Sequence, residues 1–381
     1  MEFRKDLHDV KRIVIKVGSN VITMPNGKCD LRRIRIIVED ICALIDSGRE
    51  IILVSSGAIN VGRSFLEKYL PGRIELQQSA SAIGQPKLIN KYSLLFEEND
   101  RICSQILLTH DDFKNRNRFL NAKKTIEVLL QNKVIPILNE NDTISYSDIS
   151  LGDNDHLAAQ AAQMVNADLL LIVTSAHGLY DKDPDHKEAK LIKYVCPDTD
   201  LEGIDMTSMT SSGRGGMKSK VAAIKKATRV GVKSLISSKN NERIILDPLT
   251  KELGTLFGIK DNSHTDRMAW VISTKRHNCY IDVNKASYEA LIKQQSLCAT
   301  GIIHTAGLFY KGDCVDLRYE GRTFAVGMCE FDRDEVEKIK QTVICSVILK
   351  GNLIINEGVS NEATREEIKT SLKRVTETQS S

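Results

Sequence analysis

Lysines, serines and glycines recur in this chain where short apolar runs end. The first run is followed by Lys16-Val17-Gly18-Ser19-Asn20, and the second by Ser55-Ser56-Gly57-Ala58-Ile59. The segment richest in these types is Gly213-Arg214-Gly215-Gly216-Met217-Lys218-Ser219-Lys220, where three glycines precede a helical pattern. Glycines let backbone amides approach a phosphate, and lysines neutralise its charge. These segments indicate phosphate binding, although serine helix caps and a flexible basic loop would have the same composition.

Asparagine and aspartate gather in two further segments. These are Asn139-Glu140-Asn141-Asp142-Thr143 and Gly152-Asp153-Asn154-Asp155. Such side chains could bind an amino group, a metal ion or the lysines around a phosphate, and an ordinary polar loop remains the alternative. Thr174 and Ser175 follow a wholly apolar run, where a nucleotide would lie in a doubly wound sheet.

The sequence lacks the motifs of two common kinds of kinase. The Walker A pattern is absent. The glycine-rich loop and the other signature elements of protein kinases are absent as well. The residues therefore predict a phosphoryl-transfer enzyme of another fold, and they do not identify the acceptor.

The elements that would position these segments alternate between strand and helix. Apolar runs rich in Ile, Val and Leu predict parallel strands at 12–17, 50–54, 102–108, 134–138, 169–173 and 232–236. Helical patterns lie at 31–46, 118–132, 154–166 and 217–230. This order predicts an α/β fold with a doubly wound, mainly parallel sheet, whose ligands bind at the carboxyl ends of the strands.

The pattern changes after about residue 260. A polar break at 262–265 is followed by short strand-like pieces at 280–283, 301–304, 314–317 and 323–326, separated by glycine turns. We predict three parts: a first domain over residues 1–262, a small and mostly β domain over 275–360, and a polar tail over 361–381.

Composition is that of an ordinary globular enzyme. The chain has 381 residues, of which 41% are hydrophobic and 27% charged, and its formal net charge is +3. A charge so close to balance argues against a protein that coats nucleic acid. The N-terminus lacks the apolar core of a signal peptide, no apolar run approaches the length of a membrane span, and the nine cysteines are dispersed. We therefore expect a cytoplasmic protein with reduced thiols and no membrane contact.

Longer motifs resemble the amino acid kinase family, and within it the enzymes that phosphorylate the side-chain carboxylate of glutamate. The matching segments run in order through residues 11–260 and include IKVGSNVIT, VSSGAINVGR, ASAIGQPKLI, RFLNAKKTIEVLL, VIPILNENDTIS, GDNDHLAAQAA and GRGGMKSKVAAIKKA. The lysines with glycine turns are shared across the family, whereas NENDTIS, FLNA and GDND are particular to the glutamate-phosphorylating branch. GLFYKGDCVDLRYEGRTFAVGM resembles the PUA domain that many of those enzymes carry.

The resemblance implies roles residue by residue. Lys16 and Lys220 would neutralise the transferring phosphate, and Asp155 would organise the lysines or magnesium. Ser56, Asp142 and Asn154 would bind glutamate, with Asp142 taking its ammonium group. The ATP contacts would be Lys16, Gly18, Thr174, Ser175, Gly213, Arg214, Gly215, Gly216, Met217, Lys218, Ser219 and Lys220.

Two positions depart from the family pattern. The nucleotide strand of the family usually ends in Thr-Asp and ends here in Thr174-Ser175, and Arg214 replaces a usual threonine. Both changes bear on ATP affinity.

The resemblance also implies ATP and Mg²⁺ as cofactors, a homo-oligomer, and feedback inhibition by proline, as in many relatives. The magnesium ligands cannot be assigned from spacing. PUA domains elsewhere bind RNA, but residues 275–381 hold 15 Lys plus Arg against 15 Asp plus Glu, so we expect no nucleic-acid partner. The alternatives are another acceptor within the family (N-acetylglutamate, aspartate, carbamate or UMP) or a PUA-mediated RNA-binding protein.

Overall fold

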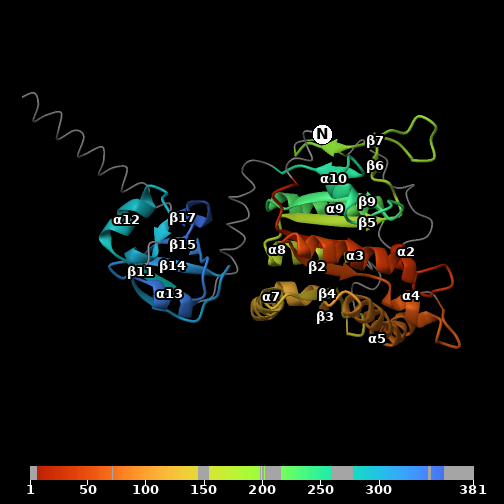
Figure 1. The fold of residues 1–381 in the computed structure, drawn as a ribbon, viewed down its shortest axis with the longest axis horizontal. Helices are drawn as coiled ribbons and strands as arrows, with labels where there is room; N and C mark the ends of the chain where they lie inside the picture. The colour runs from red at the N-terminus through yellow and green to blue at the C-terminus, as the bar shows by residue number, and fades with distance from the viewer. Residues whose placement is uncertain are drawn as a thin grey trace, which may run out of the picture. The chain divides into compact units, whose positions relative to one another are not determined.

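The computed structural model describes residues 7–70, 72–144, 154–197, 199, 201, 216–259, 278–341 and 345–355. The chain divides into two compact units between residues 263 and 264 (Figure 1). Each unit is described by itself. The polar break at 262–265 and the tail at 361–381 lie outside the described residues.

The first unit is built on an eight-stranded sheet in the order β3-β4-β2-β1-β5-β9-β10-β8. The pairs from β3 to β9 are parallel, β10 runs antiparallel to β9, and β8 is parallel to β10. This arrangement confirms the predicted doubly wound, mainly parallel sheet. The strands are β1 (Arg12–Val17), β2 (Glu50–Ser55), β3 (Ile102–Leu108), β4 (Val134–Glu140), β5 (Leu169–Thr174), β8 (Tyr194–Val195), β9 (Lys233–Ser238) and β10 (Thr255–Phe257).

Helices pack against the sheet in two groups. The helices α3 and α5 contact each other, and α3 contacts β2 while α5 contacts β3. In the other group, α7 contacts β4, α8 contacts β1 and β5, and α9 contacts β9. The main helices of this unit are α3 (Leu31–Asp46), α5 (Ile74–Glu97), α7 (Arg116–Gln131), α8 (Asn154–Met164) and α9 (Met217–Arg229). Short elements lie between them: α2 (Ser19–Ile22), α4 (Ala58–Arg63), α6 (His110–Lys114), α10 (Asp247–Thr250), β6 (Leu179–Tyr180) and β7 (Leu191–Ile192).

The core beneath α3 and α5 explains why these segments form helices. Ile34, Ile37 and Ile41 form a buried stripe along α3, and they share one hydrophobic cluster with Tyr92 and Phe96 of α5. Asp30 caps α3 by accepting a hydrogen bond from the backbone N–H of Arg33. Full burial of one such aliphatic side chain stabilises the fold by roughly 1.5–3 kcal/mol, so this stripe is a large term in the stability of the unit.

The second unit has its own sheet, in the order β13-β11-β14-β15-β17, and a separate hydrophobic core that includes Ile281, Phe309 and Leu317. Its elements are β11 (Tyr280–Val283), α12 (Lys285–Ile292), β12 (Leu297–Cys298), β13 (Ile302–Ala306), β14 (Cys314–Tyr319), β15 (Arg322–Met328), α13 (Arg333–Ile339), β16 (Ser346–Ile348) and β17 (Leu353–Ile355). This unit is mostly β, as predicted, and it also contains the two short helices α12 and α13. Among the described helices of the whole chain, none is long and apolar enough to cross a membrane.

Candidate active site

Two lysines and one aspartate meet at the carboxyl ends of the central strands. The Lys16 Nζ lies 2.6 Å from Asp155 Oδ1, and the Lys220 Nζ lies 3.0 Å from Asp155 Oδ2. The Asp155 side chain is fully buried, and both lysine side chains are more than nine-tenths buried. The structure thus brings together the three residues for which a catalytic role was predicted.

The alternation of β1 explains where Lys16 points. Ile13 and Ile15 belong to the core cluster beneath α3, so Lys16 extends to the opposite face of the sheet. That face is covered by α8, which contacts β1 and carries Asp155 in its first turn. Lys220 comes from the first turn of α9, the helix that packs beside α8.

The formal charges of this cluster favour an anionic ligand. Two ammonium groups share the Asp155 carboxylate in a buried place, at 2.6 Å and 3.0 Å. Two cations held at one point are suited to the oxygens of a phosphate. Because the side chains are already held in contact, their positive charge would meet the phosphate with little reorganisation.

The first turn of α9 adds neutral donors beside the lysines. Gly216 is the N-cap residue and Met217 is buried, whereas Lys218 is exposed. The Ser219 Oγ is buried and has no hydrogen-bond partner among the described residues, so it could serve a nucleotide phosphate. Gly213, Arg214 and Gly215 lie outside the described residues, and the effect of Arg214 stays a prediction.

The strand β5 and the turn after β1 lie next to each other. The Gly18 N–H donates to the carbonyl of Val173 at 3.3 Å. Thr174 at the end of β5 is buried, and Ser175 is exposed. These residues line the edge where the resemblance placed ATP contacts.

A further lysine, Lys239, lies at the same edge without having been predicted. Its backbone N–H donates to the Thr174 carbonyl at 2.8 Å, and its Nζ donates to the Asn20 carbonyl at 2.6 Å. Burial lowers the pKa of this ammonium group below its ordinary value. In the sequence it is one lysine after an apolar strand, with no motif to mark it.

The second cluster consists of hydrogen-bonding side chains around Asn154. Its Nδ2 donates to Ser56 Oγ and to Asn139 Oδ1, both at 2.8 Å. Ser56 is held at the sheet edge because its N–H donates to the Val17 carbonyl at 3.0 Å. The next residue, Gly57, has a φ of 107°, in the left-handed region that favours glycine, and this turn leads into α4.

Asp142 is fixed by a residue that the sequence did not point to. Ser81 Oγ of α5 donates to Asp142 Oδ2 at 2.6 Å. Neither Ser81 nor Asn139 was assigned a role from the sequence. Asn139 could have been found because it lies in the NEND segment, whereas Ser81 lies in a helix that had not been predicted.

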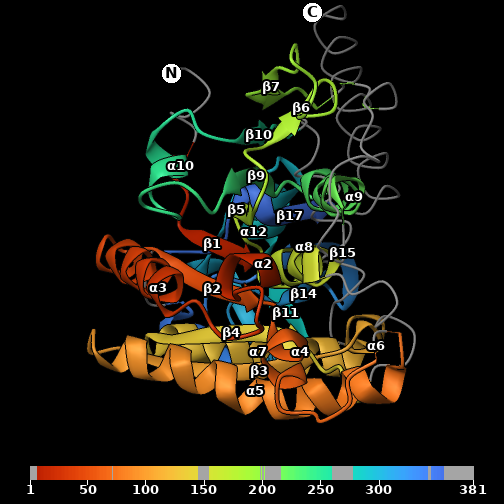
Figure 2. The same ribbon diagram turned by 90° about the vertical axis from the view of Figure 1, so that its right-hand side faces the viewer.

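The two clusters adjoin because Asn154 and Asp155 are consecutive residues at the start of α8. Figure 2 looks towards the edge of the sheet at which α2 and α4 follow β1 and β2. One cluster offers cations to a phosphate, and the other offers amide, hydroxyl and carboxylate groups to an amino acid. Within the described residues, no three His, Cys, Asp or Glu side chains are grouped to hold a metal ion.

Fold and site together define a kinase of the amino acid kinase class, and the sequence comparisons agree. The model of the amino acid kinase family matches residues 11–238, and that of the PUA domain matches residues 280–348. The chain belongs to the amino acid kinase family.

Within that family, the curated proteins that this chain is similar to include several glutamate 5-kinases. That of Caldanaerobacter subterraneus is 40% identical and that of Thermoanaerobacter sp. is 38% identical, each over 86% of this chain and 90% of the relative. That of Syntrophotalea carbinolica is 39% identical over 88% of this chain and 92% of the relative. Among solved structures, a carbamate kinase from Giardia lamblia bound to AMP-PNP aligns with 66% of this chain and 99% of its own, with 17% identity and a TM-score of 0.49.

Proposed function

We propose that this chain transfers the γ-phosphoryl group of ATP to the side-chain carboxylate of L-glutamate, forming L-glutamyl 5-phosphate, the first step of proline biosynthesis. The observation that carries the proposal is the pairing of Lys16 and Lys220 on Asp155, directly beside the Asn154 cluster. The glutamate 5-kinases named above, which are 38–40% identical to this chain, support glutamate as the acceptor.

The chemistry requires charge neutralisation and alignment more than proton transfer. A glutamate side chain has an ordinary pKa of about 4.3, so the nucleophile is already ionised at neutral pH. A carboxylate oxygen attacks the γ-phosphorus, a new oxygen–phosphorus bond forms, and the bond to the β–γ bridging oxygen breaks to release ADP. No proton has to be removed from the nucleophile, so no general base is required.

The lysine pair faces the transferring group in this proposal. Lys16 and Lys220 bind the phosphoryl oxygens. Asp155 contacts both ammonium groups and so fixes their positions between ATP and glutamate. As the terminal phosphoryl passes to the carboxylate, these charges remain fixed around it. Gly18, Thr174, Ser175, Lys218 and the first-turn amides of α9 contact the nucleotide.

The second cluster binds the ammonium and carboxylate groups of glutamate. Asp142, held by Ser81, accepts from the ammonium group. Ser56 and Asn154 contact the carboxylates, and Asn139 keeps the Asn154 amide in place. Two charged ends and a fixed length between them would distinguish glutamate from aspartate and from N-acetylglutamate.

Magnesium would enter on the triphosphate. Mg²⁺ in kinases commonly keeps waters and one or two carboxylates beside the substrate phosphates, and Asp155 is the carboxylate that the lysine pair contacts. The ion would neutralise phosphate charge when bound.

The setting of the enzyme completes the proposal. All nine cysteines are free thiols, which supports a reducing, cytoplasmic compartment. We further propose a homo-oligomer and inhibition by proline. Light scattering tests the first, and the assay below with added proline tests the second.

The test is acyl-phosphate formation. Purified protein, ATP, Mg²⁺ and hydroxylamine are incubated with glutamate, aspartate or N-acetylglutamate, and hydroxamate and ADP are measured. We expect hydroxamate with glutamate alone, and we expect its loss in Lys16→Ala and Lys220→Ala. No hydroxamate with any acceptor would reject the proposal and direct the search to carbamate, UMP and then RNA.

A further inference from the structure

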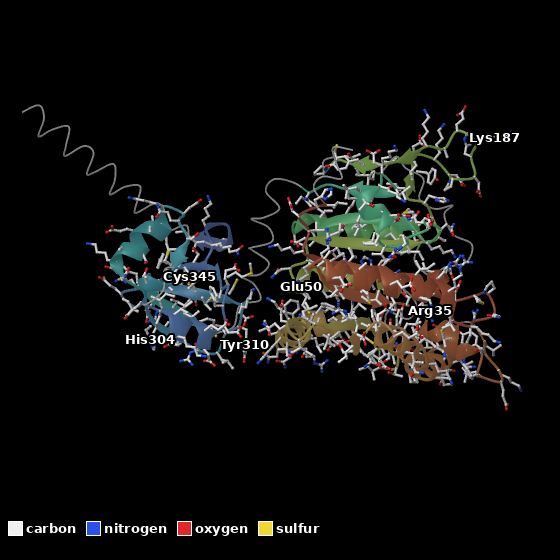
Figure 3. The ribbon with its side chains drawn as sticks, in the orientation of Figure 1. Arg35, Glu50, Lys187, His304, Tyr310 and Cys345 are labelled. Carbon is white, nitrogen blue, oxygen red and sulfur yellow. The ribbon has the colours of Figure 1, made fainter. Side chains whose placement is uncertain are left out.

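A pocket of about 420 Å³ opens at the opposite edge of the sheet from the proposed active site. It lies at the amino ends of β2 and β4, between the segments that end α3 and α7 and the residue that precedes β3. Figure 3 labels Glu50 at this edge. A strand of six or seven residues spans roughly 20 Å, so the pocket is well separated from Ser56 and Asn139 at the other ends of β2 and β4.

Cationic side chains outnumber carboxylates in the pocket wall. Arg49, Arg101 and Lys133 line it, together with Asp46 and Glu50. Both carboxylates already have arginine partners: Asp46 is paired with Arg101, and Glu50 lies 2.7 Å from Arg12, which is outside the lining. The wall therefore offers Arg49 and Lys133 to a ligand that is negatively charged.

Arg49 is held in place but retains a donor. Its Nη1 donates to Ser47 Oγ at 2.7 Å, and its Nη2 donates to the His8 carbonyl at 3.5 Å. Its Nε is buried and has no hydrogen-bond partner among the described residues. An unsatisfied buried N–H is unfavourable, and an anionic ligand bound at Arg49 would relieve that cost.

Lys133 is fixed at the turn between α7 and β4. Its φ is 58°, and its backbone N–H donates to the Leu130 carbonyl at 2.9 Å. In the part of the chain that the structure describes, no carboxylate is paired with it. The turn thus places an exposed cation at the mouth of the pocket.

The rest of the wall is apolar. Ile45, Leu130 and Ile135 line the pocket as well. The volume falls in the range of small-molecule sites, which combine apolar walls with a few placed polar groups. We propose that this distal pocket binds a small organic carboxylate, with its charged end on Arg49 and Lys133 and its hydrocarbon body against the isoleucines and Leu130.

The test uses the full chain with saturating glutamate and ATP analogue, so that the active site is occupied. Hexanoate is titrated by calorimetry, and 1-hexanol is the neutral probe of matched length. We expect hexanoate to bind and the alcohol to bind at least about tenfold more weakly, because the charge–charge contacts are lost. Added salt should weaken hexanoate binding.

Two substitutions locate the site. Arg49→Gln and Lys133→Gln, alone and together, should each raise the Kd of hexanoate several-fold, whereas Lys187→Gln, which removes an exposed lysine labelled in Figure 3, should leave it unchanged. Lys133 is exposed, so its substitution should not impair folding, and thermal unfolding verifies this. The proposal is overturned if hexanoate does not bind, if hexanol binds equally well, or if Lys133→Gln leaves the affinity unchanged. Because glutamate kinase activity is measured separately, failure here is distinguishable from failure of the proposed function.

Discussion

At the scale of single residues, Asp155 determines how the two lysines are arranged. It is the carboxylate that both ammonium groups contact, and it is fully buried. Without its charge, Lys16 and Lys220 would repel each other in a medium of low dielectric constant. They could then no longer meet the γ-phosphoryl group from fixed positions.

Asp155→Asn should therefore lower kcat by about 100-fold or more in the hydroxamate assay, the range seen when one element of a preorganised electrostatic site is removed. The KM for glutamate should change less, because Asn154 and Asp142 remain. Asp111→Asn, which removes an exposed carboxylate paired with Lys114, is the matched control and should leave kcat unchanged. A kcat for Asp155→Asn close to that of the control would contradict the role.

Ser81 acts through Asp142 as a positioning residue. Its hydroxyl donates to Asp142 Oδ2 at 2.6 Å, so Ser81→Ala removes a contact that orients the carboxylate proposed to bind the glutamate ammonium group. Loss of a hydrogen bond to a charged group costs roughly 1.5–3 kcal/mol, which predicts a rise of about tenfold or more in the KM for glutamate.

A merely structural role would not separate the kinetic constants in this way. We expect kcat and the KM for ATP to stay near their original values, and Ser81→Thr to restore part of the glutamate affinity because the hydroxyl is kept. Equal changes in the KM values for ATP and glutamate would argue that Ser81 only supports the fold.

At the scale of elements, the crossing of α4 and α5 positions one wall of the glutamate site. A Cβ added at Gly62 would overlap the Ala80 carbonyl oxygen, and one added at Gly84 would overlap the Ala58 carbonyl oxygen. The two backbones can lie this close only because both positions are glycine. The crossing ties Ser56, just before α4, to Ser81 on α5.

Gly84→Ala should therefore destabilise the first unit by about 1–3 kcal/mol, the usual cost of overpacking. It should also raise the KM for glutamate, because α5 must move away from α4. Urea unfolding and the hydroxamate assay measure the two effects. Ser79→Ala, on the exposed face of the same helix, is the control, and equal stabilities of the two variants would show that the crossing is not tight.

The elements differ in how far sequence could predict them. The predicted strands at 12–17 and 102–108 coincide with β1 and β3. β1 was predictable because a buried parallel strand has a continuous apolar sequence. β3 lies at the edge of the sheet and only Leu108 is buried, but its run of Ile and Leu residues still marked it as a strand. In contrast, α5 was not predicted, although it is a helix of 24 residues. Its buried positions include the polar residues Gln77, Ser81 and Gln85, so no single apolar stripe marks it. Gly84 and Pro86 lie within the helix, and both are poor helix formers.

The same limit applies to the site. The lysines could be recognised as phosphate-binding residues, and the Asn–Asp segments as candidate amino-acid-binding residues, because they follow predicted strands. That Asp155 might organise the two lysines was suggested only by the family resemblance. Spacing could not show it, because Lys16, Asp155 and Lys220 come from three elements that are brought together by packing of α8 and α9 over β1 and β5. The Ser81–Asp142 contact was hidden because it depends on the unpredicted α5.

At the scale of the whole molecule, the two units have separate cores. Ile13, Ile37 and Tyr92 belong to one cluster, and Ile281 and Phe309 belong to another. Every described residue of the proposed active site belongs to the first unit. We therefore expect the catalytic groups to keep their arrangement when the second unit is removed.

A chain ending at residue 262 should consequently fold and keep its kcat and its KM for glutamate within about twofold, as expected for a domain with its own core. Circular dichroism and the hydroxamate assay on the shortened and full chains provide the measurement. A folded but inactive short chain would show that the C-terminal unit contributes directly to catalysis.

The charge of the C-terminal region makes a prediction about nucleic acid. Residues 275–381 carry equal numbers of basic and acidic side chains, 15 of each. Affinity for nucleic acid comes largely from release of counterions by basic groups, and even non-specific binding at physiological salt has a Kd of roughly 10⁻⁴–10⁻⁶ M. With no excess of basic groups, this region should bind structured RNA no more tightly than about 10⁻⁴ M, with little dependence on salt.

Fluorescence anisotropy of a labelled stem–loop at two salt concentrations tests this on the full chain. A sub-micromolar Kd that weakens steeply with salt would mean that a local basic surface exists despite the balanced total, and RNA binding would then have to be added to the role of this enzyme.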